Sequence, residues 1–122
     1  MNIERYEKIR IITFILMILA TFFHIIQLFF IQIDLKWFIA LTGFILYTIA
    51  SIGVFLNKKF GYIISIIFPT FGGAVIITVS IIALFIQVQL LIFNIFTFLA
   101  ACVEIPAVIF SIILLKNYVM LD

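Results

Sequence analysis

Charged side chains are scarce in this chain and are missing altogether from most of its length. They make up 10% of its 122 residues, whereas a typical soluble domain has roughly 25%. Apolar residues make up 68%, and the few basic residues are scattered rather than gathered into a surface that would attract nucleic acid. The composition therefore predicts the lipid bilayer as a partner and no binding of nucleic acid.

Cysteine and histidine occur once each, as Cys102 and His24. One thiol cannot form a disulfide within the chain, and the two residues together cannot supply the ligands of a zinc site, an iron–sulfur cluster or a bis-histidine haem. The sequence also has no glycine-rich phosphate loop and no serine-nucleophile elbow. These absences predict no cofactor, no metal site and no catalytic residue, and they argue against an enzyme that acts on its own.

Long apolar runs are what the chain has in abundance. The runs between Arg10 and Asp34 and between Lys36 and Lys58 contain 23 and 21 residues without a formal charge, and a helix needs about 20 to cross a bilayer. A third run, 60–115, has 56 residues and a single carboxylate. As one helix it would reach roughly 84 Å, against a hydrocarbon core of about 30 Å. This run must therefore fold back once.

These lengths predict an all-α, polytopic integral membrane protein with four transmembrane helices in an up-down antiparallel bundle. The whole chain, 1–122, would form a single domain with spans at about 9–31, 37–57, 61–85 and 91–115. Trp37 and Tyr62 are expected to anchor span ends at the membrane interface. Gln87 and Gln89 are favoured for the third turn, with Asn94 as the competing position. The first run is longer than a signal-peptide core of roughly 7–15 residues, which favours an uncleaved span.

Basic residues are divided unequally between the two sides of such a bundle. With four spans, the N-terminus, the second turn and the C-terminus share one side, and the opposite side holds only Lys36. The six basic residues on the shared side are Arg5, Lys8, Arg10, Lys58, Lys59 and Lys116. Because basic residues collect on the cytoplasmic side, we expect a multi-pass protein of the cell membrane with both termini in the cytoplasm.

Small and polar residues recur along each predicted span at alternating steps of three and four. In lipid such residues mark the faces on which helices pack, and for most of them we expect a packing role alone. The stripes of the first two spans are Thr13, Met17, Ala20, His24 and Gln27, then Gly43, Tyr47, Ala50, Ser51 and Val54. Those of the last two are Tyr62, Ser65, Pro69, Gly72, Ile76 and Ala83, then Asn94, Thr97, Ala101, Glu104, Val108 and Ser111. The opposite faces, mostly Ile, Leu and Phe, are expected to contact acyl chains.

Glu104 is the most informative single residue, because it lies near the centre of the last span. A charged side chain there costs about 2.5–3.5 kcal/mol on insertion scales, so we expect its carboxyl group to be protonated, paired or facing water. Two interpretations stay open: a protonated Glu104 that only fixes helix packing, and a proton- or ion-binding group. Pro106 favours the second slightly, because it leaves the carbonyl of Cys102 without its helical partner.

Span three contains Pro69 followed closely by Gly72 and Gly73. The proline releases the carbonyl of Ser65, and the two glycines weaken the helix just beyond it. We therefore expect a helix break here and another at Pro106. Broken helices often line binding sites in transporters.

Residue counts place four polar side chains at similar depth. From the predicted cytoplasmic edge, His24 would lie about 22 Å deep, Glu104 about 16 Å and Tyr47 about 15 Å, with Thr70 in the break at about 12–18 Å. Side chains lean toward the N-terminus of their own helix, so His24 and Glu104 on antiparallel spans lean toward each other. The sequence predicts a buried polar layer of His24, Tyr47, Thr70 and Glu104, with a His24–Glu104 hydrogen bond if spans one and four adjoin.

Three functions fit these features. The favoured one is a non-enzymatic accessory or structural subunit that packs with partner membrane proteins or with itself. The second is a small oligomeric ion or proton-coupled transporter or channel, in which Glu104 is the protonatable group. The third is a membrane subunit of a redox complex, in which His24 contributes to a cofactor or proton path shared with other chains. We expect either a homo-oligomer or other membrane protein subunits as partners.

Overall fold

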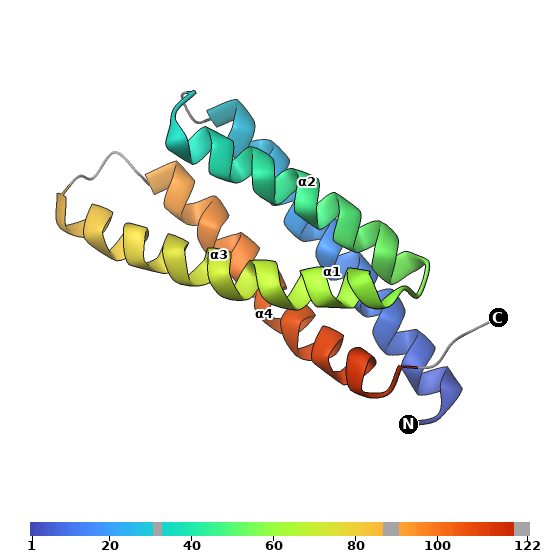
Figure 1. Ribbon diagram of the computed structural model, residues 1–122. Helices are drawn as coiled ribbons and strands as arrows, with labels where there is room; N and C mark the ends of the chain where they lie inside the picture. Colours follow the sequence, from blue (N-terminus) through green and yellow to red (C-terminus); the bar gives the residue numbers. More distant parts are fainter. Residues whose placement is uncertain (31–32, 87–90, 119–122) are drawn as a thin grey trace.

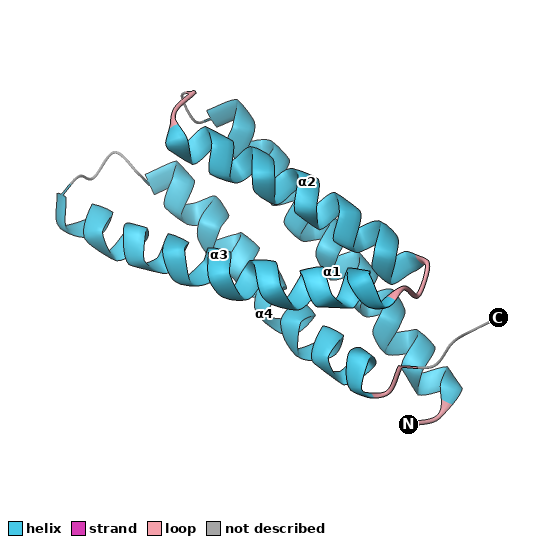
Figure 2. Cartoon of the chain, in the orientation of Figure 1, coloured by secondary structure: helices cyan, strands magenta, loops and turns pink. Residues whose placement is uncertain are grey.

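Four α-helices make up the described part of the computed structural model, which covers residues 1–30, 33–86 and 91–118 (Figures 1 and 2). Within these ranges, side chains are described except at 36, 73–86, 91–94 and 97. The helices are α1 (Ile3–Phe30), α2 (Leu35–Phe55), α3 (Lys59–Ile86) and α4 (Leu91–Lys116). The all-α prediction is confirmed, and each helix corresponds to one of the four predicted spans. Gln87 and Gln89, favoured for the third turn, lie outside the described residues.

Polar side chains fix where the first two helices begin. Asn2 Oδ1 accepts a hydrogen bond from the backbone N–H of Arg5 at 2.9 Å, and Asp34 Oδ1 accepts one from that of Trp37 at 3.3 Å. These N-cap bonds satisfy backbone donors that have no partner inside the helix. α1 therefore begins several residues before the predicted span.

The turn between α2 and α3 is a Schellman motif built on Asn57. This residue has a φ of 51°, in the left-handed region that asparagine tolerates better than most residues. The N–H of Lys58 bonds to the carbonyl of Gly53 at 2.7 Å, and the N–H of Asn57 bonds to that of Val54 at 3.1 Å. The turn brings the two helices together so closely that a Cβ on Gly53 would lie 2.5 Å from the Cα of Gly61.

The four helices form a ring in which each packs against two others. α1 contacts α2 and α4, and α3 contacts the same two helices. Consecutive helices run in opposite directions (Figure 1). One face of each helix therefore meets the others along the axis of the ring, and that is where the core lies.

The inward faces of α1 and α2 agree with the prediction: all ten residues of the predicted small and polar stripes on these helices are buried. In α3, Tyr62, Ser65 and Pro69 are buried and Gly72 is half-buried. The burial of Tyr62, at 0% exposed, corrects its prediction as an interfacial anchor. The remaining stripe positions of α3, at 76 and 83, lie outside the described side chains.

The inward face of α4 differs from the predicted stripe. Glu104 and Ser111 are buried as predicted, but Ala101 and Val108 are only half-buried. The other buried positions of this helix are Ala100, Ala107 and Leu114. α4 is therefore rotated so that two alanines approach the neighbouring helices, because small side chains allow the closest helix contact. Positions 94 and 97 of the predicted stripe lie outside the described side chains.

The outward faces carry large apolar side chains. Among the exposed residues are Ile15, Phe22, Ile45, Phe98 and Ile109. Within the described residues, three helical segments are long and apolar enough to cross a membrane: Ile3–Phe30, Trp37–Phe55 and Phe98–Lys116. The segment Lys59–Gly72 of α3 is apolar but shorter.

The predicted helix breaks are not present. α3 runs without interruption through Pro69, Gly72 and Gly73, and α4 runs through Pro106. A proline removes one backbone hydrogen bond, but a helix that gave up the bonds around it would leave several more polar groups unpaired in apolar surroundings. Continuing the helix is therefore the less costly arrangement.

Candidate functional site: a buried polar layer

Three helices each contribute one polar side chain to the centre of the bundle. His24 comes from α1, Tyr47 from α2 and Glu104 from α4, and their exposed fractions are 4%, 1% and 8%. His24 Nε2 lies 4.0 Å from Glu104 Oε1, and the centroids of the His24 and Tyr47 rings are 4.9 Å apart. We call these three residues the polar layer.

The fourth residue predicted for this layer is elsewhere. Thr70 is exposed, and its hydroxyl donates a hydrogen bond to the carbonyl of Ile66 at 2.6 Å. Because α3 does not break at Pro69, Thr70 keeps the position that a regular helix gives it, one residue away from the buried Pro69 face. The polar layer is therefore formed by α1, α2 and α4.

The hydrogen bonding of His24 fixes which of its nitrogens faces Glu104. Nδ1 lies 2.8 Å from the carbonyl of Ala20, and a carbonyl only accepts, so Nδ1 carries a hydrogen. In a neutral ring, Nε2 is then the acceptor, and this is the nitrogen next to the carboxyl group. One proton is shared between Nε2 and the Glu104 carboxyl group. If it is on Glu104, both groups are neutral; if it is on Nε2, the two groups form an ion pair. At 4.0 Å the two groups are neighbours without a direct hydrogen bond.

Gly43 makes room for the His24 ring. A Cβ at this position would lie 2.8 Å from Nε2 and 3.2 Å from Cγ, and it would overlap Cδ2. Tyr47, one turn further along α2, packs its ring against both the imidazole and Phe68, with 4.9 and 5.2 Å between centroids. α2 therefore sets the position of the imidazole through one small residue and one large one.

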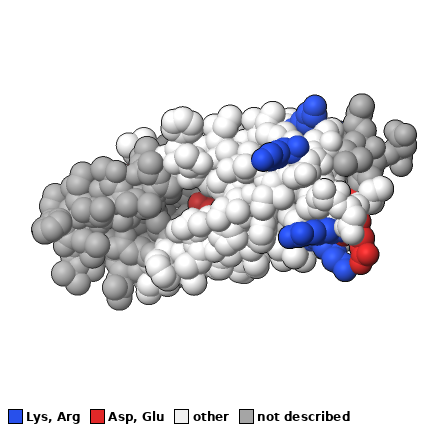
Figure 3. Space-filling model, turned by 90° about the horizontal axis from the view of Figure 1, so that it is seen from below, with Lys and Arg blue, Asp and Glu red and all other residues white. Residues whose placement is uncertain are grey.

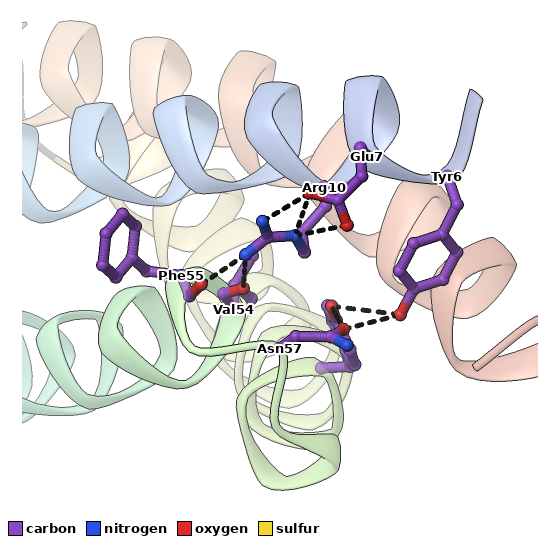
Figure 4. Close-up of polar contacts among 7 residues, drawn as sticks. Tyr6, Glu7, Arg10, Val54, Phe55 and Asn57 are labelled. Carbon is purple, nitrogen blue, oxygen red and sulfur yellow. Dashed lines mark hydrogen bonds and ion pairs between the residues drawn. The ribbon is translucent and has the colours of Figure 1, made fainter. Parts of the chain in front are cut away.

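A second cluster of polar side chains, at the end of the bundle, was missed by the sequence analysis. The Oδ1 atom of Asn57 accepts hydrogen bonds from the hydroxyls of Tyr6 at 2.7 Å and Tyr62 at 2.6 Å. The Tyr118 hydroxyl donates to the backbone carbonyl of Asn57 at 3.0 Å. Figure 4 shows Tyr6 reaching across to the turn that carries Asn57. We call Tyr6, Asn57, Tyr62 and Tyr118 the tyrosine cluster; it joins α1, the α2–α3 turn, α3 and the end of α4.

Arg10 makes a further link between α1 and α2. Its guanidinium pairs with Glu7 at 2.5 Å and donates to the carbonyls of Val54, at 3.4 Å, and of Phe55 (Figure 4). Four of its five N–H donors are used in this way. The last carbonyls of a helix lack partners within the helix. Arg10 supplies a partner for the Phe55 carbonyl at the end of α2 and a second one for the Val54 carbonyl, which already accepts from Asn57.

The tyrosine cluster and Arg10 lie where α1 begins and where α2 and α4 end. Figure 3 shows Lys, Arg and acidic side chains gathered toward one end of the molecule, next to a stretch of uncharged surface, with a single acidic side chain visible at mid-length. The basic residues in these elements are Arg5, Lys8, Arg10, Lys58, Lys59 and Lys116. We call this the basic end of the bundle.

A sequence signal for the tyrosine cluster exists in retrospect. Three of the four tyrosines of the chain, at 6, 62 and 118, lie beside predicted span ends that share one side. Tyrosine at a span end is usually an interfacial anchor, and that rule gave the wrong prediction for Tyr62. The exception follows from Asn57, whose side chain supplies an acceptor that a buried hydroxyl needs.

Comparisons with models of protein families, with curated proteins and with solved structures gave no match to the chain.

Proposed function

We propose that the chain is a four-span protein of the cell membrane with both termini in the cytoplasm. Three segments of sufficient length and apolarity support membrane insertion, and the 56-residue apolar run that contains α3 and α4 supports two of the four crossings. The six basic residues of the basic end, against Lys36 at the other end, support the orientation.

The orientation is tested with single cysteines in a Cys102→Ala background. Asn2→Cys and Asp34→Cys place a thiol at opposite ends of α1, both at exposed positions. In intact cells, a membrane-impermeant maleimide is expected to label the thiol at position 34 and not that at position 2. Labelling of both, or of position 2 alone, would contradict the proposal.

Within the membrane, the protein acts as a non-enzymatic accessory or structural module that packs with partner membrane proteins or with itself. The observation that carries this proposal is the separation of side chains by face. In the described bundle interior, Thr13, Ser51 and Ser65 donate to carbonyls of their own helices and His24 lies beside Glu104, whereas Ser111 has no hydrogen bond. The outward faces of the described helices carry exposed Ile, Leu and Phe side chains. A surface of this kind suits contact with lipid and with other apolar helices.

Native mass spectrometry of the gently extracted protein tests this function. A stable complex with other polypeptides, or a homo-oligomer without transport activity, is the expected result. Outward substitutions such as Phe98→Ala would weaken the complex, whereas Phe60→Ala, also exposed but at the basic end of the bundle, serves as the matched control. A protein that stays monomeric at all concentrations, with no partner, would contradict the module.

The polar layer favours a second candidate function, proton-coupled transport by an oligomer of this chain. His24 and Glu104, 4.0 Å apart and buried, form an acid–base pair at mid-bundle, and ionisable residues at that depth often serve proton relays. The test is proton-driven flux in proteoliposomes. Flux that disappears in Glu104→Ala but persists in Thr70→Ala, a variant of the exposed residue outside the polar layer, would favour transport over the module. Flux that survives Glu104→Ala would exclude a proton-coupling role for this residue.

A further inference from the structure

A groove with a volume of about 320 Å³ lies on the outer surface of the bundle, between α1 and α2. Much of its rim is exposed. Its lining residues are Phe14, Ile18 and Thr21 from α1, Thr48, Ser51, Ile52 and Phe55 from α2, and Leu56 from the turn that follows α2. We call it the α1–α2 groove.

The dimensions of the α1–α2 groove fit a hydrocarbon chain and not a helix. Its lining positions extend over eight residues on the α1 side and nine on the α2 side, which corresponds to roughly 11 Å along the axis. Spread over that length, the volume leaves a cross-section of about 30 Å². A helix with its side chains is about 10–12 Å across and needs several times that area.

The chemistry of the groove floor is apolar in spite of its three hydroxyl residues. Thr21, Thr48 and Ser51 each donate to the carbonyl four residues earlier in their own helix, at 2.8, 2.7 and 2.6 Å. Each hydroxyl hydrogen is therefore already used, and what faces the groove is carbon. A ligand in this groove needs no hydrogen-bonding groups along its length.

One end of the groove meets the basic end of the bundle. Arg10 lies one turn before Phe14 on α1 and bonds to the carbonyl of Phe55, which lines the groove. Glu7 balances the charge of Arg10, and Lys59 lies over the ring of Tyr118 at 4.9 Å.

Lys58, by contrast, has no such contact among the described residues. It is exposed, it follows the groove residue Leu56 by two positions, and no acidic side chain pairs with it in the described part of the chain. An apolar channel that ends beside this charge matches an amphiphile with a negative head.

We propose that the α1–α2 groove binds an anionic phospholipid of the cytoplasmic leaflet. One acyl chain lies between Ile18 and Ile52, and the phosphate lies at the basic end beside Lys58. This inference rests on the orientation proposed above, because the cytoplasmic leaflet is the one that supplies anionic lipid at that end.

The test is native mass spectrometry of the purified full chain with an equimolar mixture of phosphatidylglycerol and phosphatidylcholine that carry the same acyl chains. The wild-type protein is expected to retain one phosphatidylglycerol in preference to phosphatidylcholine. Ile52→Trp places a bulky ring at the rim and is expected to abolish retention. Ile49→Trp is the matched control, because Ile49 is also an exposed isoleucine of α2 but does not line the groove.

The headgroup contact is tested separately. Lys58→Gln is expected to lower the preference for phosphatidylglycerol by about fivefold, whereas Lys116→Gln, which removes a charge at the end of α4, leaves it unchanged. Circular dichroism checks the fold of each variant. Thr48→Leu, which fills the groove from its floor, replaces Ile52→Trp if that variant does not fold.

Equal lipid retention by Ile52→Trp and Ile49→Trp would overturn the proposal, and so would the absence of any preference between the two headgroups. Loss of a second copy of the chain, rather than of lipid, in Ile52→Trp would also overturn it and make the groove a protein interface. Cysteine labelling tests the orientation independently. The same mass spectra show whether the chain is bound to other polypeptides or to itself, which tests the proposed structural module. A failure of the lipid proposal is therefore distinguishable from a failure of the proposed function.

Discussion

Replacing Gly43 by alanine is the sharpest test of the polar layer, because the Cα of this residue lies directly against the His24 ring. The new Cβ would lie 2.8 Å from Nε2 and would overlap Cδ2. The ring has little freedom to move, since it is 4% exposed and its Nδ1 donates to the Ala20 carbonyl at 2.8 Å. Either this hydrogen bond breaks or α2 shifts away from α1.

The expected cost follows from three contributions. Forcing one methyl group into a packed core costs about 1–3 kcal/mol, and loss of the Nδ1 hydrogen bond adds about 1 kcal/mol. The higher helix propensity of alanine offsets about 0.5–1 kcal/mol. Gly43→Ala is therefore expected to lower the free energy of unfolding by about 1–3 kcal/mol. Unfolding in detergent micelles, followed by circular dichroism, measures it.

Gly72 provides the matched control, because it also lies within a helix. Among the described side chains, a Cβ there would meet only the Phe68 ring, at 3.8 Å, so Gly72→Ala should be neutral or stabilising by up to about 1 kcal/mol. In a His24→Ala background the clash at Gly43 is gone, and Gly43→Ala should then behave like the control. An unchanged cost in that background would refute the contact on which this reasoning depends.

Three further predictions concern other polar groups. His24→Ala and Glu104→Gln, made singly and together, are expected to lower stability non-additively, with a coupling of about 0.5 kcal/mol or more; additive losses in detergent unfolding would argue against contact. Ser111 Oγ, at 0% exposed, is the one buried side-chain oxygen or nitrogen in the described residues without a hydrogen bond. Ser65, also at 0%, donates to the Gly61 carbonyl at 2.7 Å. Ser111→Ala should therefore be more stable than Ser65→Ala by about 1 kcal/mol, and the reverse order would show that the Ser111 hydroxyl is satisfied. Asn57→Gly keeps the left-handed backbone but removes the acceptor of two tyrosine hydroxyls, so a loss of about 1–3 kcal/mol is expected on thermal unfolding; an unchanged stability would mean that the tyrosine cluster contributes nothing.

The sequence was sufficient for the helices and for most of their inward faces. Charge-free runs set the number and approximate bounds of the helices, because a helix in lipid satisfies its backbone internally. The spacing of small and polar residues placed the inward faces of α1 and α2, since both helices present one narrow polar stripe. Residue counts along the helices, with the lean of side chains toward the N-terminus of their own helix, brought His24, Tyr47 and Glu104 to one layer, as the structure has them.

The errors come from interactions that depend on a partner helix. On α4, Ala100 and Ala107 compete with Ala101 and Val108 for the inward face, and the choice depends on how closely α1 and α3 approach. Proline and glycine in α3 suggested a break, but local propensity was outweighed by the cost of unpaired backbone groups. Thr70 was assigned to the polar layer on the strength of that break and is exposed without it. The rule that tyrosines at span ends are interfacial anchors likewise cannot reveal a buried hydrogen-bond acceptor such as Asn57, which lies 51 residues from Tyr6 in the sequence.

The two candidate functions place different demands on the core between the basic end and the polar layer. From that end inward, the described core has the tyrosine cluster with Val54 and Leu114, and then an apolar cluster that includes Met17 and Ala107 beside Tyr47. A structural module needs only this closed arrangement.

A transporter would need a second conformation in which the core opens toward the basic end. α2 and α3 are held together by the Schellman turn and by the contact of Gly53 with Gly61, so the opening would separate α1 from that pair. The contacts that would have to break are the Tyr6–Asn57 hydrogen bond and the bonds of Arg10 to the end of α2. Weakening the first with Asn57→Gly would therefore lower stability in either case, but it would change flux only if the protein opens.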